Sequence, residues 1–318
     1  YPLPDEMIRE FAGRVDDLWI VEELDPFIEE QVKALGVKCR GKGRLSMCGE
    51  LSPDKVKAAI SNQEHASAAQ IELPGRPPSM CPGCPHRGML YALKRNKCFI
   101  CGDIGCYTLG FLPPLDAIDT TLCMGAGINH AHGMSKAFGA GKEKIVAVIG
   151  DSTFFHSGIT GLLNLAYNDG AAVIVILDNR TTAMTGSQNH PGTGITLEGQ
   201  ATINVDIETL VKALGIQWVA RVNPYDIKAT RQKVNEALEC EGPAVIISES
   251  PCVLLKSRNV SGRVLRVDSE KCTGCKVCIG LGCPALELRE DKAFISDLCV
   301  GCGLCSELCP ADAIGGDI

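Results

Sequence analysis

The sequence lacks the features that mark nucleic-acid-binding, membrane-spanning or exported proteins. Its formal net charge is −7 and no block of Lys or Arg reverses that balance locally, so nothing supports nucleic-acid binding. The longest apolar runs, such as residues 171–177, are far shorter than the roughly 20 residues that a membrane helix needs. No charged-then-apolar leader opens the chain, so we expect no membrane partner and a cytoplasmic setting.

Cysteine, in contrast, is abundant, with 18 among 318 residues. A secreted scaffold held by disulfides would be much smaller, so metal ligation or redox chemistry explains the cysteines better. Eight of them form two runs near the C-terminus, and each run ends in Cys-Pro. The first run is Cys272, Cys275, Cys278 and Cys283, and the second is Cys299, Cys302, Cys305 and Cys309.

The spacing within these two runs is typical of bacterial ferredoxins. The second run has the C-x2-C-x2-C-x3-C-P pattern, and the first differs by one extra residue before its fourth cysteine. In that pattern the fourth cysteine of each run binds the cluster of the other run. We therefore predict two [4Fe–4S] clusters, one held by Cys272, Cys275, Cys278 and Cys309 and the other by Cys299, Cys302, Cys305 and Cys283. A pair of structural zinc sites is the alternative, but it does not explain two runs that both end in Cys-Pro.

The middle of the chain alternates between strand-like apolar runs and helical periodicity. Residues 144–149 and 172–177 are rich in β-branched residues, and apolar positions between them recur at helical spacing. A third apolar run, residues 244–247, follows a predicted helix at residues 224–238. This order predicts an α/β domain with a doubly wound parallel sheet.

Four segments follow from these patterns. Ahead of the α/β domain, one predicted strand at residues 18–21 and one helix near residues 26–35 form a fragment too short for a complete domain, followed by a polar, proline-containing stretch. We therefore expect part of an α/β domain at residues 1–58, a linker at 59–78, the doubly wound domain at 79–258 and a ferredoxin domain of the α+β class at 259–318.

Polar residues follow two of the predicted strands directly. Gly150, Asp151 and Ser152 end the first strand, and Asn179 follows the second. In open α/β sheets, ligands bind beyond the carboxyl ends of the strands. The Asp151 carboxylate, the Asn179 amide oxygen and the Thr181 carbonyl are oxygen ligands that suit Mg²⁺, with two diphosphate oxygens and a water completing the set.

A glycine-rich turn lies upstream of these strands. Gly125 and Gly127 lead into a predicted helix that ends near Phe138. Backbone N–H groups at such a helix start favour phosphate oxygens, although many glycine-rich turns only pack tightly. Together with Asp151 and Asn179, the turn predicts a site for a diphosphate and Mg²⁺.

Several motifs resemble those of the 2-oxoacid:ferredoxin oxidoreductases. Gly150-Asp151 followed by Asn179 is similar to the thiamine diphosphate signature, with Ser152 where a glycine is usual. The segment DNRTTAMTGSQ at residues 178–188 looks like the N-N-x-x-Y-x-M-T-G-G-Q segment of this family. The segments CPGCPHRG at residues 81–88 and GDSTFFHSG at 150–158 resemble the alpha subunits of the indolepyruvate type more specifically. The resemblance covers nearly the whole chain.

This resemblance implies both an activity and a set of partners. It implies a thiamine diphosphate enzyme that oxidatively decarboxylates a 2-oxo acid, here an aryl pyruvate such as indolepyruvate, transfers the acyl group to coenzyme A and passes electrons to external ferredoxin. It also implies a hetero-oligomer with a second, beta- or gamma-type subunit in an anaerobic cytoplasm. A sister enzyme acting on pyruvate, branched-chain oxo acids or aryl glyoxylates is the first alternative. An electron-transfer subunit without thiamine chemistry is the second.

The family also has a pyrimidine-binding domain, which carries the glutamate that activates the cofactor. No part of this chain looks like that domain, and the chain begins with Tyr1 rather than Met. On the same resemblance, residues 1–58 are the end of a transketolase C-terminal-like domain. We therefore expect that an N-terminal part is absent here, and that the chain alone binds thiamine diphosphate incompletely and turns over little.

The resemblance further implies a third [4Fe–4S] cluster beside the thiamine site. The matching positions are Cys81, Cys84, Cys106 and Cys252. Cys98 and Cys101 form a rival C-x2-C pair in the same stretch. His156 follows Asp151 closely and is the candidate acid/base or oxyanion donor near the reacting carbon, with a packing role as the alternative.

Overall fold

The computed structural model describes residues 2–63, 75, 77–138, 144–255 and 264–316. The chain divides into two compact units, Tyr1–Arg76 and Pro77–Ile318. The first unit contains the helices α1 (Asp5–Ala12), α2 (Phe27–Ala34) and α3 (Pro53–Ser61). Val32 and Leu45 are its buried apolar side chains.

Two features of this first unit differ from the expectations above. The strand expected at residues 18–21 is reduced to a single bridge between Trp19 and Arg40. Helix α3 runs to Ser61, into the segment expected to be a linker, and ends where Asn62 adopts a left-handed conformation at φ 55°. Most of that expected linker, residues 64–74 and 76, lies outside the described residues.

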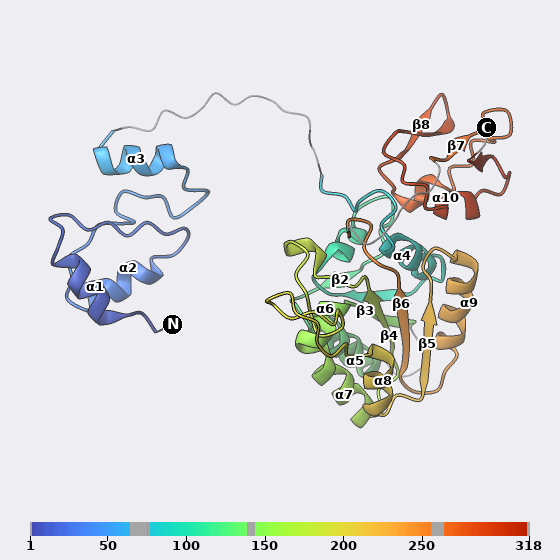
Figure 1. Cartoon of the computed structure of the whole chain (residues 1–318), viewed down its shortest axis with the longest axis horizontal. Helices are drawn as coiled ribbons and strands as arrows, with labels where there is room; N and C mark the ends of the chain where they lie inside the picture. The colour runs from blue at the N-terminus through green and yellow to red at the C-terminus, as the bar shows by residue number, and fades with distance from the viewer. Residues whose placement is uncertain (1, 64–74, 76, 139–143, 256–263, 317–318) are drawn as a thin grey trace. The chain divides into compact units, whose positions relative to one another are not determined.

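The second unit is built on a parallel sheet of six strands (Figure 1). Its order is β2 (Thr120–Thr121), β1 (Phe99–Gly102), β3 (Ile145–Gly150), β4 (Val173–Asp178), β6 (Ala244–Glu249) and β5 (Trp218–Val222). Strands β3 and β4 are buried along their whole length, as strands covered on both faces must be. The predicted α/β class with a parallel sheet is confirmed.

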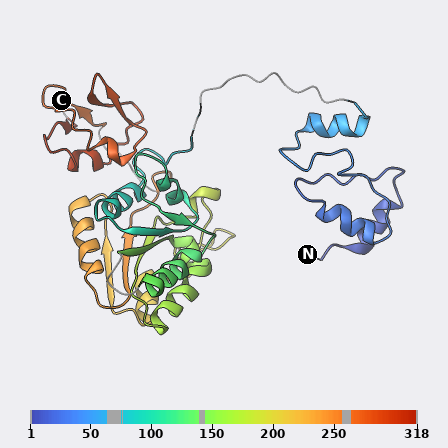
Figure 2. The ribbon, with the colours of Figure 1, turned by 180° about the vertical axis from the view of Figure 1, so that it is seen from behind.

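Helices cover both faces of this sheet, which gives a three-layer domain (Figures 1 and 2). Alternate residues of β3 separate into two apolar cores, with Val146 and Val148 in one and Ile145, Ala147 and Ile149 in the other. The first core includes residues of α4 (His86–Arg95) and α9 (Ile227–Leu238). The second includes residues of α5 (Ala126–Phe138), α7 (Ile159–Tyr167) and α8 (Ile207–Ala213).

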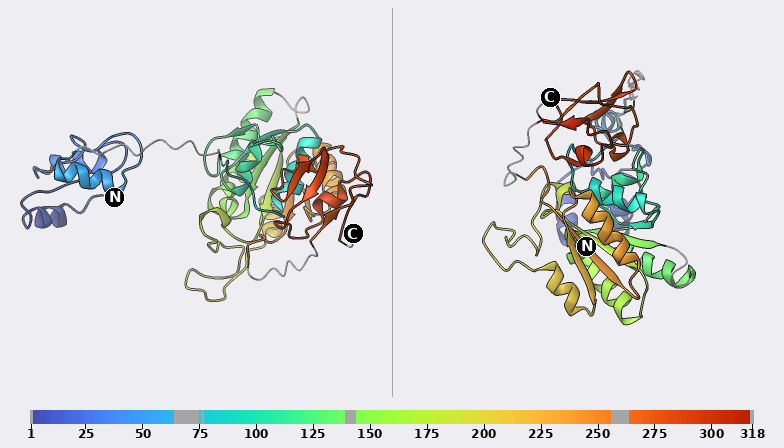
Figure 3. Two further views of the ribbon diagram at one scale, coloured as in Figure 1. Left: turned by 90° about the horizontal axis from the view of Figure 1, so that it is seen from above. Right: turned by 90° about the vertical axis from the view of Figure 1, so that its right-hand side faces the viewer.

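The C-terminal segment contains little regular structure. Strands β7 (Arg266–Val267) and β10 (Ile314–Gly315) pair antiparallel, as do β8 (Leu286–Arg289) and β9 (Lys292–Ile295). The 3-10 helix η4 (Ile279–Leu281) and the short helix α10 (Leu304–Glu307) complete its described part. Leu281 and Leu304 belong to the same apolar core as α4, so this segment packs on the α/β domain (Figure 3). Among the described residues, every helix is too short or too polar to span a lipid bilayer.

Candidate functional site

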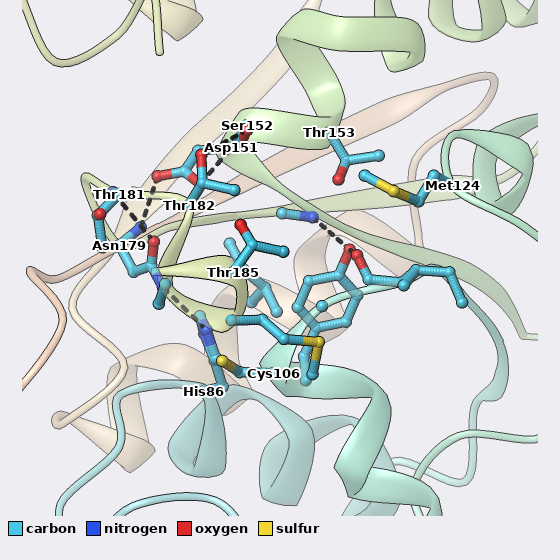
Figure 4. Close-up of a pocket in the computed structure, with 17 residues that line it drawn as sticks. His86, Cys106, Met124, Asp151, Ser152, Thr153, Asn179, Thr181, Thr182 and Thr185 are labelled. Atoms are coloured by element: carbon cyan, nitrogen blue, oxygen red, sulfur yellow. Dashed lines mark hydrogen bonds between the residues drawn. The ribbon is translucent and has the colours of Figure 1, made fainter. Parts of the chain in front are cut away.

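A cavity of about 80 Å³ lies beyond the carboxyl ends of the central strands. Residues that follow β1, β3 and β4 line it, because parallel strands deliver their ends to one edge of the sheet. The lining includes His86, Cys106, Tyr107, Met124, Gly150, Asp151, Ser152, Asn179 and Thr181 (Figure 4). The structure therefore brings together most of the residues that the sequence predicts for a diphosphate and Mg²⁺. Gly125 and Gly127 are not among the lining residues.

Asp151 is among the most enclosed of these polar residues, with 3% of its surface exposed. Its Oδ2 accepts the backbone N–H groups of Asn179 (3.0 Å) and Arg180 (2.8 Å), and its Oδ1 accepts that of Ser152 (2.7 Å). His190 Nε2 lies 3.1 Å from Oδ2. These bonds fix the carboxylate between the ends of β3 and β4.

The strand end at residues 178–181 adopts an unusual backbone to reach Asp151. Arg180 has φ +63°, a left-handed conformation that turns its N–H toward the carboxylate. Its side chain pairs with Asp178 and with Glu249, on the neighbouring strand β6. Burial and the neighbouring Asp151 raise the pKa of Asp178, and Arg180 opposes that shift.

The donor set fits a hard divalent cation. Asp151 Oδ1 accepts the Ser152 N–H, Asn179 Oδ1 accepts the Thr181 N–H at 3.3 Å, and the Asp178 side chain also hydrogen-bonds to Asp151. The amide oxygen therefore keeps a lone pair for another partner. One carboxylate, one amide oxygen and the carbonyl of Thr181 on a single wall are the oxygen ligands that Mg²⁺ prefers.

His86 is the buried histidine of this cavity, with 4% exposure. Asn179 Nδ2 lies 3.3 Å from its Nε2, and its ring meets that of Tyr107 edge-on with centroids 5.9 Å apart. Burial lowers the pKa of His86 to about 4, against the opposing charge of Asp151, so the imidazole is neutral at physiological pH. Because an amide nitrogen can only donate, this contact turns the Asn179 oxygen away from His86.

The glycine-rich turn is organised by a carboxylate of the chain itself. Asp103, which is fully buried, accepts the N–H of Gly125 through both oxygens (2.9 and 3.0 Å) and that of Gly127 through Oδ2 (3.0 Å). The N–H groups expected to bind phosphate are therefore already used. Met124, the residue before the turn, lines the cavity instead.

His156 lies apart from this arrangement. It is exposed, sits in a π-helical turn at Phe154–Gly158, and its Nδ1 lies 3.1 Å from Ser157 Oγ. It is not among the residues that line the cavity. Ser152 does line it, and its hydroxyl accepts a hydrogen bond of 2.8 Å from Thr182.

Four cysteines gather where α4 begins and where β1 and β6 end. Cys84 interacts electrostatically with Cys81 and Cys106, and Cys106 interacts with Cys81 and Cys252. The backbone N–H of Cys252 also donates to the carbonyl of Asn179 at 2.9 Å. Burial raises the pKa of Cys84 to about 12. These are the four positions that the resemblance assigned to a third cluster, and Cys106 also lines the cavity.

The rival pair has a different environment. Cys101 lies within β1, where its Cα pairs with those of Thr120 and Ala147, and Cys98 comes just before this strand. The charged groups that act on the two thiols are those of Lys144 and Asp119, not those of other cysteines.

The eight C-terminal cysteines line two separate hollows. One is lined by Cys272, Cys275, Cys278 and Cys309, and the other by Cys283, Cys299, Cys302 and Cys305. This division matches the crossed pattern, in which each fourth cysteine serves the other run. In the described residues, no three His, Cys, Asp or Glu side chains converge as they would on a single metal ion. A cubane does not need such convergence, since its four irons each take one thiolate.

Sequence reasoning missed Asp103 and Tyr107. Tyr107 donates its hydroxyl to the carbonyl of Ile104 and accepts the N–H of Gly150, each at 3.0 Å, so it joins the ends of β1 and β3. The only sequence signal for these two residues was their position in a polar turn after an apolar run. That run, which forms β1, was not predicted as a strand.

Comparisons with known proteins agree with this geometry. Residues 103–248 match the family described as thiamine pyrophosphate enzyme, C-terminal TPP binding domain, and residues 293–315 match the 4Fe-4S binding domain. A 2-oxoglutarate:ferredoxin oxidoreductase from Magnetococcus marinus, solved with 2-oxoglutarate, coenzyme A and succinyl-CoA, is similar to 56% of this chain and 65% of its own. Its TM-score is 0.49 and its sequence identity 22%, so we draw no argument from it.

Curated relatives match almost the whole chain. The indolepyruvate oxidoreductase subunit IorA of Methanothermobacter thermautotrophicus is 43% identical over 99% of this chain and 54% of its own length. The subunit of the same name from Thermococcus kodakarensis is 40% identical over 98% of this chain and 55% of its own. The chain thus spans about half the length of the curated relatives it matches. It belongs to the family of the indolepyruvate oxidoreductase subunit IorA.

Proposed function

We propose that this chain is part of an indolepyruvate-type 2-oxoacid:ferredoxin oxidoreductase, which converts aryl pyruvates to acyl-CoA and passes electrons to ferredoxin. The observation that carries the proposal is the position of Cys106. It lines the cavity with Asp151 and Asn179, and it also belongs to the group of four cysteines. In this proposal a thiamine site and a cluster site share a wall, which suits an enzyme that oxidises its substrate by single-electron steps.

In this proposal the residues of the cavity hold the diphosphate end of the cofactor. Asp151, Asn179 and the carbonyl of Thr181 bind Mg²⁺, and Gly150 and Ser152 complete that wall. Thiamine diphosphate supplies a carbanion that attacks the keto carbon of a 2-oxo acid and stabilises the charge left when CO2 departs. Buried, neutral His86 keeps the Asn179 oxygen directed away from itself and excludes water from this side.

The cysteines define the proposed path for electrons. Cys81, Cys84, Cys106 and Cys252 hold the cluster nearest the cavity. Pro82 and Gly83, between the first two of these, line the hollow of Cys283, Cys299, Cys302 and Cys305. The cluster of that hollow comes second and the cluster of Cys272, Cys275, Cys278 and Cys309 third. An external ferredoxin in an anaerobic cytoplasm accepts the electrons.

A further domain and a second subunit complete the enzyme in this proposal. The cavity of about 80 Å³ is far smaller than the roughly 300–1,000 Å³ of a typical cofactor site, so much of the cofactor needs walls from elsewhere. Coenzyme A, the pyrimidine-binding domain and the beta- or gamma-type subunit belong to the complete assembly. In this proposal the α/β domain extends over residues 79–258 and the ferredoxin domain over residues 259–318.

Iron and acid-labile sulfide, measured per chain on protein reconstituted without oxygen, test the cluster set. About twelve of each correspond to three [4Fe–4S] clusters, and about eight to the ferredoxin domain alone. We expect about twelve, a fall to about eight in C106A, and no change in C98A. A fall in C98A instead would assign the ligand to the rival pair.

Calorimetric titration with thiamine diphosphate tests the cofactor site. We expect binding that requires Mg²⁺ and that D151A weakens by more than about a hundredfold, beyond the 10–100-fold effect typical of groups outside the coordination shell. The exposed Asp54 of the other unit offers a matched control, D54A, which should bind as the unaltered chain does. Binding that is unchanged in D151A would contradict the site. Absence of binding in the complete assembly, with the pyrimidine-binding domain and the second subunit present, would favour a pure electron-transfer role.

A further inference from the structure

Arg87 is a buried cation that joins two parts of the second unit. It lies in the first turn of α4 and is 2% exposed. Its Nη1 donates to the carbonyls of Leu281 (3.0 Å) and Gly282 (2.5 Å), in the C-terminal segment. Its Nη2 donates to the carbonyl of Met80, and its Nε to that of Cys81 at 3.4 Å. Every nitrogen of the guanidinium is thus used by backbone carbonyls, which leaves none for a bound anion.

The counter-charge of Arg87 does not come from a carboxylate. In the described parts of the chain Arg87 forms no ion pair with Asp or Glu, although a buried charge is costly unless it is paired. The thiol groups whose charge, once ionised, would act most strongly on it are those of Cys283, Cys84, Cys81 and Cys302. Two of these belong to the group of four cysteines beside the cavity and two to the adjacent hollow of the C-terminal segment.

Those two sets of cysteines lie against each other at Gly83. A Cβ added at Gly83 would lie 2.3 Å from Val300 and 3.7 Å from Cys302 Sγ, so the turn between Cys81 and Cys84 packs directly on the second set. Tyr225 donates its hydroxyl to the carbonyl of Gly83 at 2.6 Å, which holds the turn from its other side.

The hollow of Cys272, Cys275, Cys278 and Cys309 has no such relation to Arg87. The hydrogen bonds of the guanidinium end at Cys81 and at Gly282, the residue before Cys283. Among the described residues, none of them ends within two residues of Cys272, Cys275, Cys278 or Cys309. The positive charge therefore favours two of the three proposed cluster sites over the third.

We propose that Arg87 is a positioning residue for electron transfer, whose fixed charge raises the reduction potentials of the two clusters on either side of it above the value each would have alone. The proposal rests on the proposed function, because it needs clusters at both sites. An electron that enters either cluster adds negative charge beside the guanidinium, which stabilises the reduced form. No bond forms or breaks and no proton moves, since the electron arrives from substrate oxidation and leaves for the next cluster.

The test is a redox titration followed by electron paramagnetic resonance on the full chain, reconstituted with iron and sulfide. R87Q removes the charge and R87K keeps a charge but loses the planar fork of donors. R95Q, which alters an exposed arginine of the same helix, is the matched control. We expect R87Q to lower the reduced-to-oxidised ratio of two clusters at least tenfold at a given potential, or 59 mV for one electron, and to leave the third unchanged. R87K should shift them by less than threefold, and R95Q should match the unaltered chain.

Other results would overturn the proposal. R87Q with three clusters at unaltered potentials would mean that the charge does not act on them. R87K shifted as far as R87Q would assign the effect to the hydrogen bonds. If R87Q assembles fewer clusters, R87K separates the two explanations. Unaltered potentials in R87K would support an effect of the charge on the clusters. Loss of clusters in R87K would mean that Arg87 only stabilises the fold around the cluster sites. About eight irons in the unaltered chain would defeat the cluster set itself, before any variant is compared.

Discussion

At the scale of single residues, two buried aspartates organise the site by accepting backbone N–H groups. Asp103 holds the turn at Gly125 and Gly127, and Asp151 holds the strand end at Asn179. A buried polar group that is hydrogen-bonded costs less free energy than one without partners. Both aspartates therefore fix loops that would otherwise have several conformations.

Gly125 lies in the turn that Asp103 holds, and the packing there leaves no room for a side chain. Its φ is +86°, and an added Cβ would lie 2.0 Å from Ser157 Oγ, so G125A combines a strained backbone with a close contact. We expect it to destabilise the protein by about 3 kcal/mol, measured by thermal unfolding. Gly133, exposed within α5 with no atom within 4 Å of an added Cβ, is the matched control. G133A should be stabilising by about 0.5–1 kcal/mol, and equal effects of the two changes would contradict this account.

The sequence was sufficient to predict site residues that directly follow a strand along the chain. It was insufficient to predict those that meet only through the pairing of strands in the sheet. Asp151 and Asn179 could be predicted because each directly follows an apolar strand. Asp103 and Gly125 are 22 residues apart and meet because β1, which ends just before Asp103, pairs with β2, which leads into the turn at Gly125. The phosphate-binding role of the N–H groups in the turn was inferred without Asp103, which takes them.

At the scale of elements, helix α4 serves three neighbours with three consecutive residues. His86 faces the cavity, Arg87 contacts the C-terminal segment and Gly88 meets the turn before α9. Successive residues of an α-helix point in directions about 100° apart, so one turn of the helix can contact all three neighbours.

The strands show which elements a local sequence pattern can predict. Strands β3, β4 and β6 were predicted within two residues at each end, whereas β1 is only four residues long and β5 is a partly exposed edge strand.

Gly88 sets the distance between α4 and the turn before α9. An added Cβ would lie 1.8 Å from the carbonyl oxygen of Pro224, a backbone atom that cannot rotate away. We expect G88A to destabilise the protein by about 3 kcal/mol or more, and to lower its melting temperature by roughly 6–12 °C. R95A on the exposed face of the same helix should stay within about 0.5 kcal/mol of the unaltered protein. A G88A melting temperature within about 2 °C of that control would show that the helices can separate without cost.

At the scale of the whole second unit, its two parts derive their stability from different sources. The α/β domain has two apolar cores, with most of the side chains of β3, β4 and β6 completely buried. The described part of the C-terminal segment has two short antiparallel pairs and two short helices, and its interior is occupied by the two hollows lined with cysteines. So small an apolar core does not hold a segment of this length together, and bound metal commonly supplies the missing free energy.

Removal of iron should therefore unfold the C-terminal segment and spare the α/β domain. Burial raises the pKa of Cys305 to about 12, so without iron its thiol is neutral, and iron binding must release its proton. Hydrogen–deuterium exchange, compared between reconstituted and chelator-treated protein, should show loss of protection at β8 and β9 and unchanged protection at β3, β4 and β6. For the same reason, cluster loading should weaken as the pH falls, because each thiolate then competes with a proton. Full protection of β8 and β9 in the iron-free protein would instead mean that contacts with α4 alone keep the segment folded.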